Sequence, residues 1–253
     1  MQVPLLDINR QHADIKEELT QVFTDALASS RFIKGPDMEA LEKEFAQYSG
    51  TADAIACASG TDALILALQA IGLQRDELVI TVPFTFFATA GAIVRAGGTP
   101  VFVDILPDTF NMDPDLLQEW LNNNCAITNR GVVHRKTRKK VAAIMPVHLF
   151  GQICNMDAIL EIAKKHNLKV IEDAAQAAGA KYKGRNAGVL GDIAGFSLNG
   201  SKNLPAGEGG IVTTNDDELI DRARKMAMFG EKIIPKGHIR LYDAEIMGFN
   251  YRN

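Results

Sequence analysis

The chain has 253 residues, 47% of them hydrophobic, and carries a formal net charge of −4 at pH 7. This length can bury one large core, and the apolar content argues against a disordered protein. The mildly negative charge gives no reason to expect a nucleic-acid partner.

The chain begins with an irregular segment followed by helices. Residues 1–12 are expected to form an extended arm, and the amphipathic pattern of residues 13–29 predicts a helix. Gly35 and Pro36 interrupt this pattern and open a second helix that we expect to run through about residue 48.

From residue 54 onward, short apolar runs alternate with amphipathic segments. Strands are expected at 54–57, 78–82, 100–104, 141–147, 168–172, 193–197 and 210–214, and helices at 63–71, 87–96, 114–122, 155–166 and 216–229. Because the apolar runs do not alternate with polar residues, both faces of the sheet should be covered. The sequence therefore predicts an α/β fold, a three-layer sandwich with a mainly parallel sheet, whose ligands would bind at the carboxyl ends of the strands.

One polar and irregular segment, residues 123–140, interrupts this alternation. It contains the basic run from His134 to Lys140. We expect a solvated loop before the next strand, with a nucleic-acid or phosphate-binding patch as the alternative.

The sequence shows none of the patterns that mark a membrane-spanning, secreted, metal-binding or disulfide-linked protein. No apolar window is long enough to cross a bilayer, and the first residues show no basic stretch followed by an apolar run. The three cysteines are scattered, with neither metal-ligand spacing nor a disulfide framework. We therefore expect a cytoplasmic protein with no membrane partner and no bound metal.

The first candidate site is the segment Ser59-Gly60-Thr61-Asp62, which follows a predicted strand. Glycine lets the backbone approach an anion closely, and the helix that follows offers free N–H groups at the positive end of its dipole. The segment could hold a phosphate, although the same residues also make a good helix cap.

The second candidate is Asp173, at the end of another predicted strand. A carboxylate buried there is costly unless it has a partner, and a protonated pyridine nitrogen would be one. A helix N-cap or a structural hydrogen bond is the alternative.

The third candidate is Lys202, which lies among small and polar residues just after a predicted strand. A lysine in such a place can be desolvated enough to act as a nucleophile, although most lysines are simply exposed. The glycine-rich segment 207–210 would let the chain turn back into the next strand.

The fourth candidate is the aromatic group in Phe84-Thr85-Phe86-Phe87, which could stack on a planar ring or pack in the core. Each of the four sites is ambiguous alone. Together they supply an anion cradle, an acid, an amine and an aromatic platform at one edge of a sheet. Those are the four contacts that a phosphorylated pyridine aldehyde requires.

Ordered motifs along the whole chain resemble the DegT/DnrJ/EryC1/StrS family of aminotransferases, which use pyridoxal phosphate and have the fold type I large domain of the aspartate aminotransferase class. The motifs are Val3-Pro4-Leu5-Leu6-Asp7, Phe32-Ile33-Lys34-Gly35-Pro36, Ala58-Ser59-Gly60-Thr61-Asp62, Pro100-Val101-Phe102-Val103-Asp104, Met145-Pro146-Val147-His148-Leu149-Phe150-Gly151, Ile171-Glu172-Asp173-Ala174-Ala175-Gln176, Ser201-Lys202-Asn203-Leu204, Gly207-Glu208-Gly209-Gly210 and Gly248-Phe249-Asn250-Tyr251-Arg252.

The resemblance implies a role for each site residue. Lys202 would form the Schiff base with the cofactor, and Asp173 would pair with its pyridine nitrogen. The remaining contacts would be Gln176 on the 3-oxygen, Phe86 on the ring face, and Gly60, Thr61 and Ser197 on the phosphate. The family also implies a homodimer, in which Asn250 reaches the active site of the partner subunit.

The reaction implied is a ping-pong transamination. An amino donor, usually glutamate in this family, would displace Lys202, which then moves a proton between substrate and cofactor. The acceptor would be a keto-sugar, commonly linked to a nucleotide. The resemblance alone does not identify the sugar, the nucleotide or the ring position.

The resemblance also implies a division into domains. Residues 13–240 would form the cofactor-binding large domain, and residues 241–253 would begin a linker to a C-terminal domain that the sequence lacks. This feature supports one alternative, a non-catalytic or regulatory truncated relative. Another alternative is a keto-sugar dehydratase of the same family, but those relatives carry histidine in place of the lysine, and Lys202 argues against it.

Overall fold

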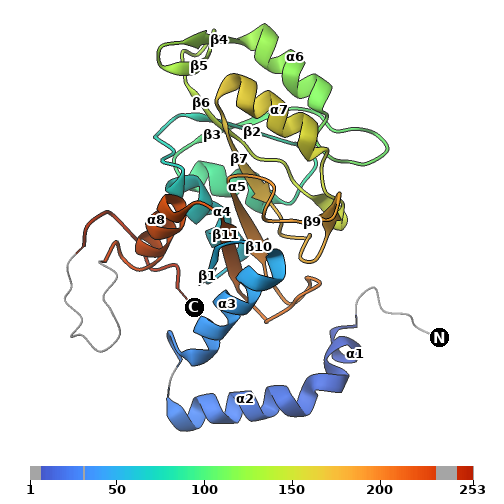
Figure 1. The fold of residues 1–253 in the computed structure, drawn as a ribbon, viewed down its shortest axis with the longest axis vertical. Coiled ribbons are helices and arrows are strands. Elements are labelled where there is room, and N and C mark those ends of the chain that lie inside the picture. The colour runs from blue at the N-terminus through green and yellow to red at the C-terminus, as the bar shows by residue number, and fades with distance from the viewer. Residues whose placement is uncertain (1–6, 31, 232–243, 253) are drawn as a thin grey trace.

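A seven-stranded sheet forms the centre of the computed structural model, which describes residues 7–30, 32–231 and 244–252 (Figure 1). Across the sheet the strands are β1 (Asp53–Cys57), β11 (Gly210–Thr214), β10 (Ile193–Ser197), β7 (Lys169–Asp173), β6 (Val141–Ile144), β2 (Leu78–Thr81) and β3 (Thr99–Phe102). The pairs from β10 to β3 are parallel, whereas β11 runs antiparallel to both of its neighbours. The expectation of a mainly parallel sheet is confirmed.

Helices cover both faces of this sheet, which makes three layers. On one face, α4 (Gly60–Ala70), α5 (Phe87–Arg95) and α8 (Asp217–Ala227) share a core with β-strand residues such as Ile171 and Val212. On the other face lie α3 (Pro36–Ser49), α6 (Pro114–Asn124) and α7 (Met156–His166), packed on residues such as Val170 and Phe196. Burial of apolar surface on both faces is the main force that holds such a sheet.

Side-chain caps mark where several helices begin. The carboxylates of Asp113 and Asp216 and the hydroxyl of Ser59 each accept a backbone N–H from the first turn of α6, α8 and α4. Such caps satisfy backbone groups that have no partner inside the helix. The expected helices therefore form within a few residues of their predicted limits.

The N-terminal arm was predicted wrongly over residues 8–12. This segment forms α1 (Ile8–His12), followed by a 3-10 turn (Ala13–Ile15) and α2 (Lys16–Ser29). The Asp7 carboxylate accepts the Arg10 N–H at 3.1 Å and so caps α1. The rest of the predicted arm, residues 1–6, lies outside the described residues, as do residues 241–243 and 253 of the predicted linker.

The segment 123–140 is also more regular than expected. It contains a two-stranded hairpin of β4 (Cys125–Thr128) and β5 (Gly131–His134), where a loop was predicted. The His134 ring stacks on Trp120 of α6, with ring centroids 5.7 Å apart, which fixes the hairpin to the body. Lys139 and Lys140 form ion pairs with Asp76 and Glu77.

The remaining short elements are a 3-10 turn (Leu149–Gly151), β8 (Lys181–Tyr182) and β9 (Arg185–Asn186).

Helix α2 projects from the rest of the structure and has no buried residue (Figure 1). Its apolar side chains Leu19, Val22, Phe23 and Leu27 are all exposed, at a spacing that places them along one side of the helix. Among the described residues, no helix is both long enough and apolar enough to cross a membrane.

Candidate active site

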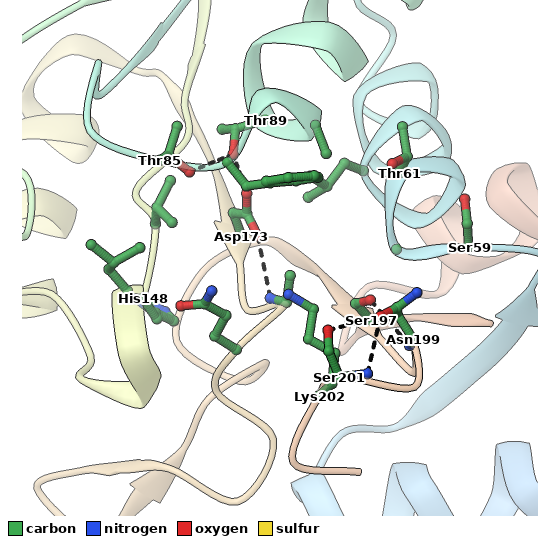
Figure 2. A pocket seen from close by; sticks show the side chains of 18 of the residues that line it. Ser59, Thr61, Thr85, Thr89, His148, Asp173, Ser197, Asn199, Ser201 and Lys202 are labelled. Atoms are coloured by element: carbon green, nitrogen blue, oxygen red, sulfur yellow. Dashed lines mark hydrogen bonds between the residues drawn. The ribbon is translucent and has the colours of Figure 1, made fainter. Parts of the chain in front are cut away.

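A cavity of about 400 Å³ opens at the carboxyl ends of β1, β7 and β10 (Figure 2). This is the edge of the sheet where a parallel α/β fold is expected to bind its ligand. The residues that line it are Ser59, Gly60, Thr61, Leu64, Thr85, Phe86, Ala88, Thr89, Val147, His148, Leu149, Asp173, Ala175, Gln176, Ser197, Asn199, Ser201, Lys202 and Glu208. Seven of the eight predicted site residues are therefore brought together.

Asp173 is the last residue of β7 and is almost completely buried. Burial raises the pKa of its carboxyl, while hydrogen bonds from the Thr89 hydroxyl (2.7 Å) and the Ala175 N–H (3.2 Å) act in the opposite direction. The positive charge of Lys202 also lowers it, without reversing the net rise. A cation placed in the cavity beside this carboxyl would relieve the cost of its burial.

Lys202 lies on the loop that joins β10 to β11, and its half-buried side chain lines the same cavity (Figure 2). Among the described residues, its ammonium group has no hydrogen bond or ion pair. The amine is therefore available to a ligand that enters the cavity. This is the situation that a lysine nucleophile requires.

Gly60 and Ser197 line one corner of the cavity, next to Gly210, where β1, β11 and β10 lie side by side. Cys57 and Ser197 are both register partners of Gly210. A Cβ atom on Gly60 would lie only 2.6 Å from the Ser197 Cβ, so only glycine fits there. The N–H groups of Gly60 and Thr61 at the start of α4 have no acceptor among the described residues, which suits an anion such as a phosphate.

The two other predicted contacts come from loops on either side. Phe86 precedes α5, and its side chain is 67% exposed, so it is not the core residue that the alternative interpretation required. The Gln176 side chain lines the cavity and accepts the Phe150 N–H at 2.7 Å. That bond uses the amide oxygen of Gln176 and leaves its N–H groups for a ligand.

Asn250 is the predicted site residue that the cavity does not include. It is exposed and pairs through its backbone with Met228, at the end of α8. Its predicted role, contact with the active site of a partner subunit, stays a prediction.

Two buried residues, His148 of the cavity lining and its partner Glu172, received no role from the sequence. His148 Nε2 donates to a Glu172 oxygen at 2.9 Å, and Nδ1 accepts the Cys154 N–H, so the ring is held on both sides. The same carboxylate accepts three backbone N–H groups, those of Gly188, Leu190 and Gly191. The sequence signal was present, because both residues belong to the quoted motifs and stand at the ends of predicted strands.

The Glu172 carboxylate is thus fully satisfied. Burial alone would raise its pKa, but the hydrogen bonds from His148 and from the backbone outweigh that effect and hold the pKa below its usual range. Glu172 and Asp173 are adjacent on β7 and therefore point to opposite faces of the sheet. Glu172 is thus a structural anion with four hydrogen-bond donors around it. Asp173 has two such donors, and a nearby cation would stabilise its charged form.

The comparison with known proteins agrees with this geometry. Residues 13–252 match the DegT/DnrJ/EryC1/StrS aminotransferase family. The chain belongs to this family. Members of the family use pyridoxal phosphate or its amine form, and the cavity suits that group, with a free amine, a buried acid without a saturating partner and a corner of unpaired N–H groups.

Two curated relatives are close in sequence. A pleiotropic regulatory protein of Geobacillus stearothermophilus is 46% identical over 253 residues, which is all of this chain and 62% of the relative. GDP-perosamine synthase of Caulobacter vibrioides is 47% identical over 211 residues, 83% of this chain and 51% of the relative. The chain thus spans less than two thirds of the length of each.

Two solved structures share the fold of the family. A DegT DnrJ EryC1 StrS aminotransferase from Brucella abortus matches with a TM-score of 0.89 and 34% identity, over 100% of this chain and 64% of that chain. NtdA from Bacillus subtilis, with bound cofactor PMP, matches with a TM-score of 0.83 and 33% identity, over 100% of this chain and 53% of that chain.

Proposed function

We propose that this chain is the cofactor-binding part of a pyridoxal-phosphate-dependent aminotransferase that transfers an amino group to a keto-sugar. The observation that carries the proposal is the meeting of Asp173 and Lys202 in one cavity, beside an anion-binding corner. The relatives support the substrate class, because one of them is a GDP-perosamine synthase. A nucleotide-linked keto-sugar as acceptor and glutamate as donor belong to the same proposal.

The residues of the chain divide the work as follows. When bound, pyridoxal phosphate supplies an aldehyde that exchanges amines and a ring that accepts electrons from a substrate carbon. Asp173 would keep the ring nitrogen protonated, because a carboxylate at that nitrogen favours its charged form. Lys202 would hold the cofactor covalently and, once released, would move a proton at the substrate carbon.

The other contacts orient the cofactor. The N–H groups of Gly60 and Thr61, with the Ser197 hydroxyl, would bind the phosphate, where the dipole of α4 also favours negative charge. Phe86 would cover one face of the ring, and Gln176 would donate to the 3-oxygen. These contacts hold the ring between Asp173 and Lys202.

The decisive experiment is covalent capture of the cofactor. The purified chain mixed with pyridoxal phosphate should develop the absorbance of a Schiff base, and borohydride should then fix the cofactor to Lys202. Lys202→Ala should abolish both signals, while Lys164→Ala, which changes an exposed lysine of α7, should leave them intact. Capture at other lysines alone would contradict the assignment.

A regulatory role is the second candidate, because one close relative is called a pleiotropic regulatory protein. Glutamate distinguishes the two. An aminotransferase should convert the bound cofactor to its amine form when glutamate is added, with a matching amount of 2-oxoglutarate. Cofactor capture without this half-reaction would favour the non-catalytic alternative.

A further inference from the structure

The loop that carries Lys202 is braced by its own polar groups. It spans residues 198–209 and joins the antiparallel neighbours β10 and β11. Three backbone hydrogen bonds close its base, from Leu198 to Gly209, from Gly200 to Gly207 and from Ala206 to Leu198, at 2.7–2.8 Å. The tip, with Lys202, extends beyond these bonds and is held by one further backbone bond and by side chains.

Asn199 holds the tip on one side of Lys202. Its side-chain oxygen accepts the N–H and the hydroxyl of Ser201, at 3.1 and 2.8 Å, and its carbonyl accepts the Lys202 N–H at 2.8 Å. Its amide nitrogen donates to a Glu208 carboxylate oxygen at 2.6 Å, across the loop. One residue thus fixes the turn that contains Lys202 and ties it to the returning segment.

Asn203 holds the tip on the other side. Its amide nitrogen donates to the Ala178 carbonyl at 2.6 Å. Ala178 follows Gln176 on the segment that leaves β7 after Asp173. The bond therefore connects the loop of the amine to the segment that carries the acid.

The amide of Asn199 also affects the charge near Lys202, because it binds the carboxylate of Glu208. Glu208 and Lys202 line the same cavity, and a free carboxylate there would attract the lysine ammonium. Asp173 already interacts with the charge of Lys202. A lysine must lose its proton to attack an aldehyde, so a second carboxylate left unbound nearby would further suppress the reactive form. The hydrogen bond from the Asn199 amide holds the Glu208 carboxylate against the loop.

We propose that Asn199 and Asn203 are positioning residues for Lys202. They direct a flexible four-carbon side chain toward Asp173, and Asn199 keeps Glu208 away from the amine. This inference rests on the proposed function, because it assumes that Lys202 is the residue that captures the cofactor.

The test measures how fast the full chain forms the Schiff base with pyridoxal phosphate. Asn199→Ala and Asn203→Ala should each slow capture by about threefold to tenfold, the effect of losing hydrogen bonds that orient the nucleophile. Asn203→Leu, which nearly keeps the size but removes the donor without adding a charge, should match Asn203→Ala. Asn186→Ala is the control, because that amide also donates to backbone carbonyls, those of Tyr48 and Ser49, away from the loop.

A pH series separates positioning from general loss of structure. In Asn199→Ala the pH at which capture reaches half its maximal rate should rise, and adding Glu208→Ala should bring it back. Unchanged rates in both Asn199→Ala and Asn203→Ala, an equal loss in Asn186→Ala, or a pH shift that survives Glu208→Ala would overturn the inference. A wild-type chain that captures no cofactor would overturn the proposed function as well.

Discussion

Asp173 is a buried acid whose burial is only partly offset by hydrogen bonds within the fold. Because burial raises the pKa of its carboxyl above the ordinary 3.8, the folded protein holds this proton more tightly than the unfolded chain does. The contribution of Asp173 to stability is therefore fully present below its ordinary pKa and falls as pH rises through the higher folded pKa. Strained or costly groups of this kind are typical of functional sites.

Replacing this acid should separate stability from function. Asp173→Asn should raise the free energy of unfolding of the cofactor-free chain by about 1–2 kcal/mol at pH 8, because it removes a buried charge without a full set of partners. The gain should be smaller at pH 4 than at pH 8, because the raised pKa means that a larger fraction of the wild-type carboxyl is protonated at the lower pH. Denaturant titration at both pH values checks this, and a variant less stable than wild type at pH 8 would contradict it. Cofactor affinity should fall in the same variant.

Glu172 should behave in the opposite way. Glu172→Leu should lower the free energy of unfolding by about 3–5 kcal/mol, because it leaves His148 and three backbone N–H groups buried without their acceptor. Since its folded pKa is depressed, the stability that Glu172 contributes is present above its ordinary 4.5 and is lost as pH falls through the lower folded value. Glu119→Gln, on the exposed side of α6, is the control for denaturant titration.

At this scale, the sequence predicted the chemical groups better than their partners. Asp173 and Lys202 stand at strand ends, so their meeting follows from the rule for parallel sheets. The pair of His148 and Glu172 joins residues 24 positions apart, and the contact depends on β6 and β7 being neighbours. Only the arrangement of the strands reveals such a bond.

Among the elements, the junction of β1 and β11 leaves no room for a larger residue. A Cβ atom on Gly210 would lie 2.2 Å from the Ser59 carbonyl oxygen. Gly210→Ala should lower the free energy of unfolding by about 1–3 kcal/mol, the usual cost of overpacking, and should weaken phosphate binding at the same corner. Gly91→Ala, in the exposed interior of α5 with open space around it, should instead stabilise by about 0.5–1 kcal/mol. Thermal melts would show shifts of opposite sign, and equal shifts would contradict the prediction.

The elements themselves were largely predictable, because buried strands are short apolar runs between turn residues. β7 and β10, for example, appear within one residue of their expected limits. The antiparallel direction of β11 and the hairpin of β4 and β5 were not predicted. Strand direction and pairing depend on partners distant in the chain, and the polar sequence of that hairpin resembles a loop.

For the whole molecule, the homodimer predicted from the family resemblance gives Asn250 a role that can be tested by mixing. Lys202→Ala and Asn250→Ala should each be inactive in the half-reaction with glutamate. A heterodimer of the two would contain one site that carries both changes and one site that carries neither. An equal mixture, after exchange of subunits, should therefore recover about a quarter of the wild-type sites. No recovery, despite heterodimers seen by sedimentation, would contradict a contribution from the partner subunit.

The walls of the cavity are drawn from opposite halves of the chain, since Ser59 to Thr61 come early and Ser197 to Lys202 come late. They meet only when β11 has inserted between β1 and β10. A chain that has only begun to fold, or one still being synthesised, has no place to receive the coenzyme. The yellow colour of the bound coenzyme would therefore report completed folding. An excess of pyridoxal phosphate would protect the finished domain by mass action without assisting its earlier intermediates.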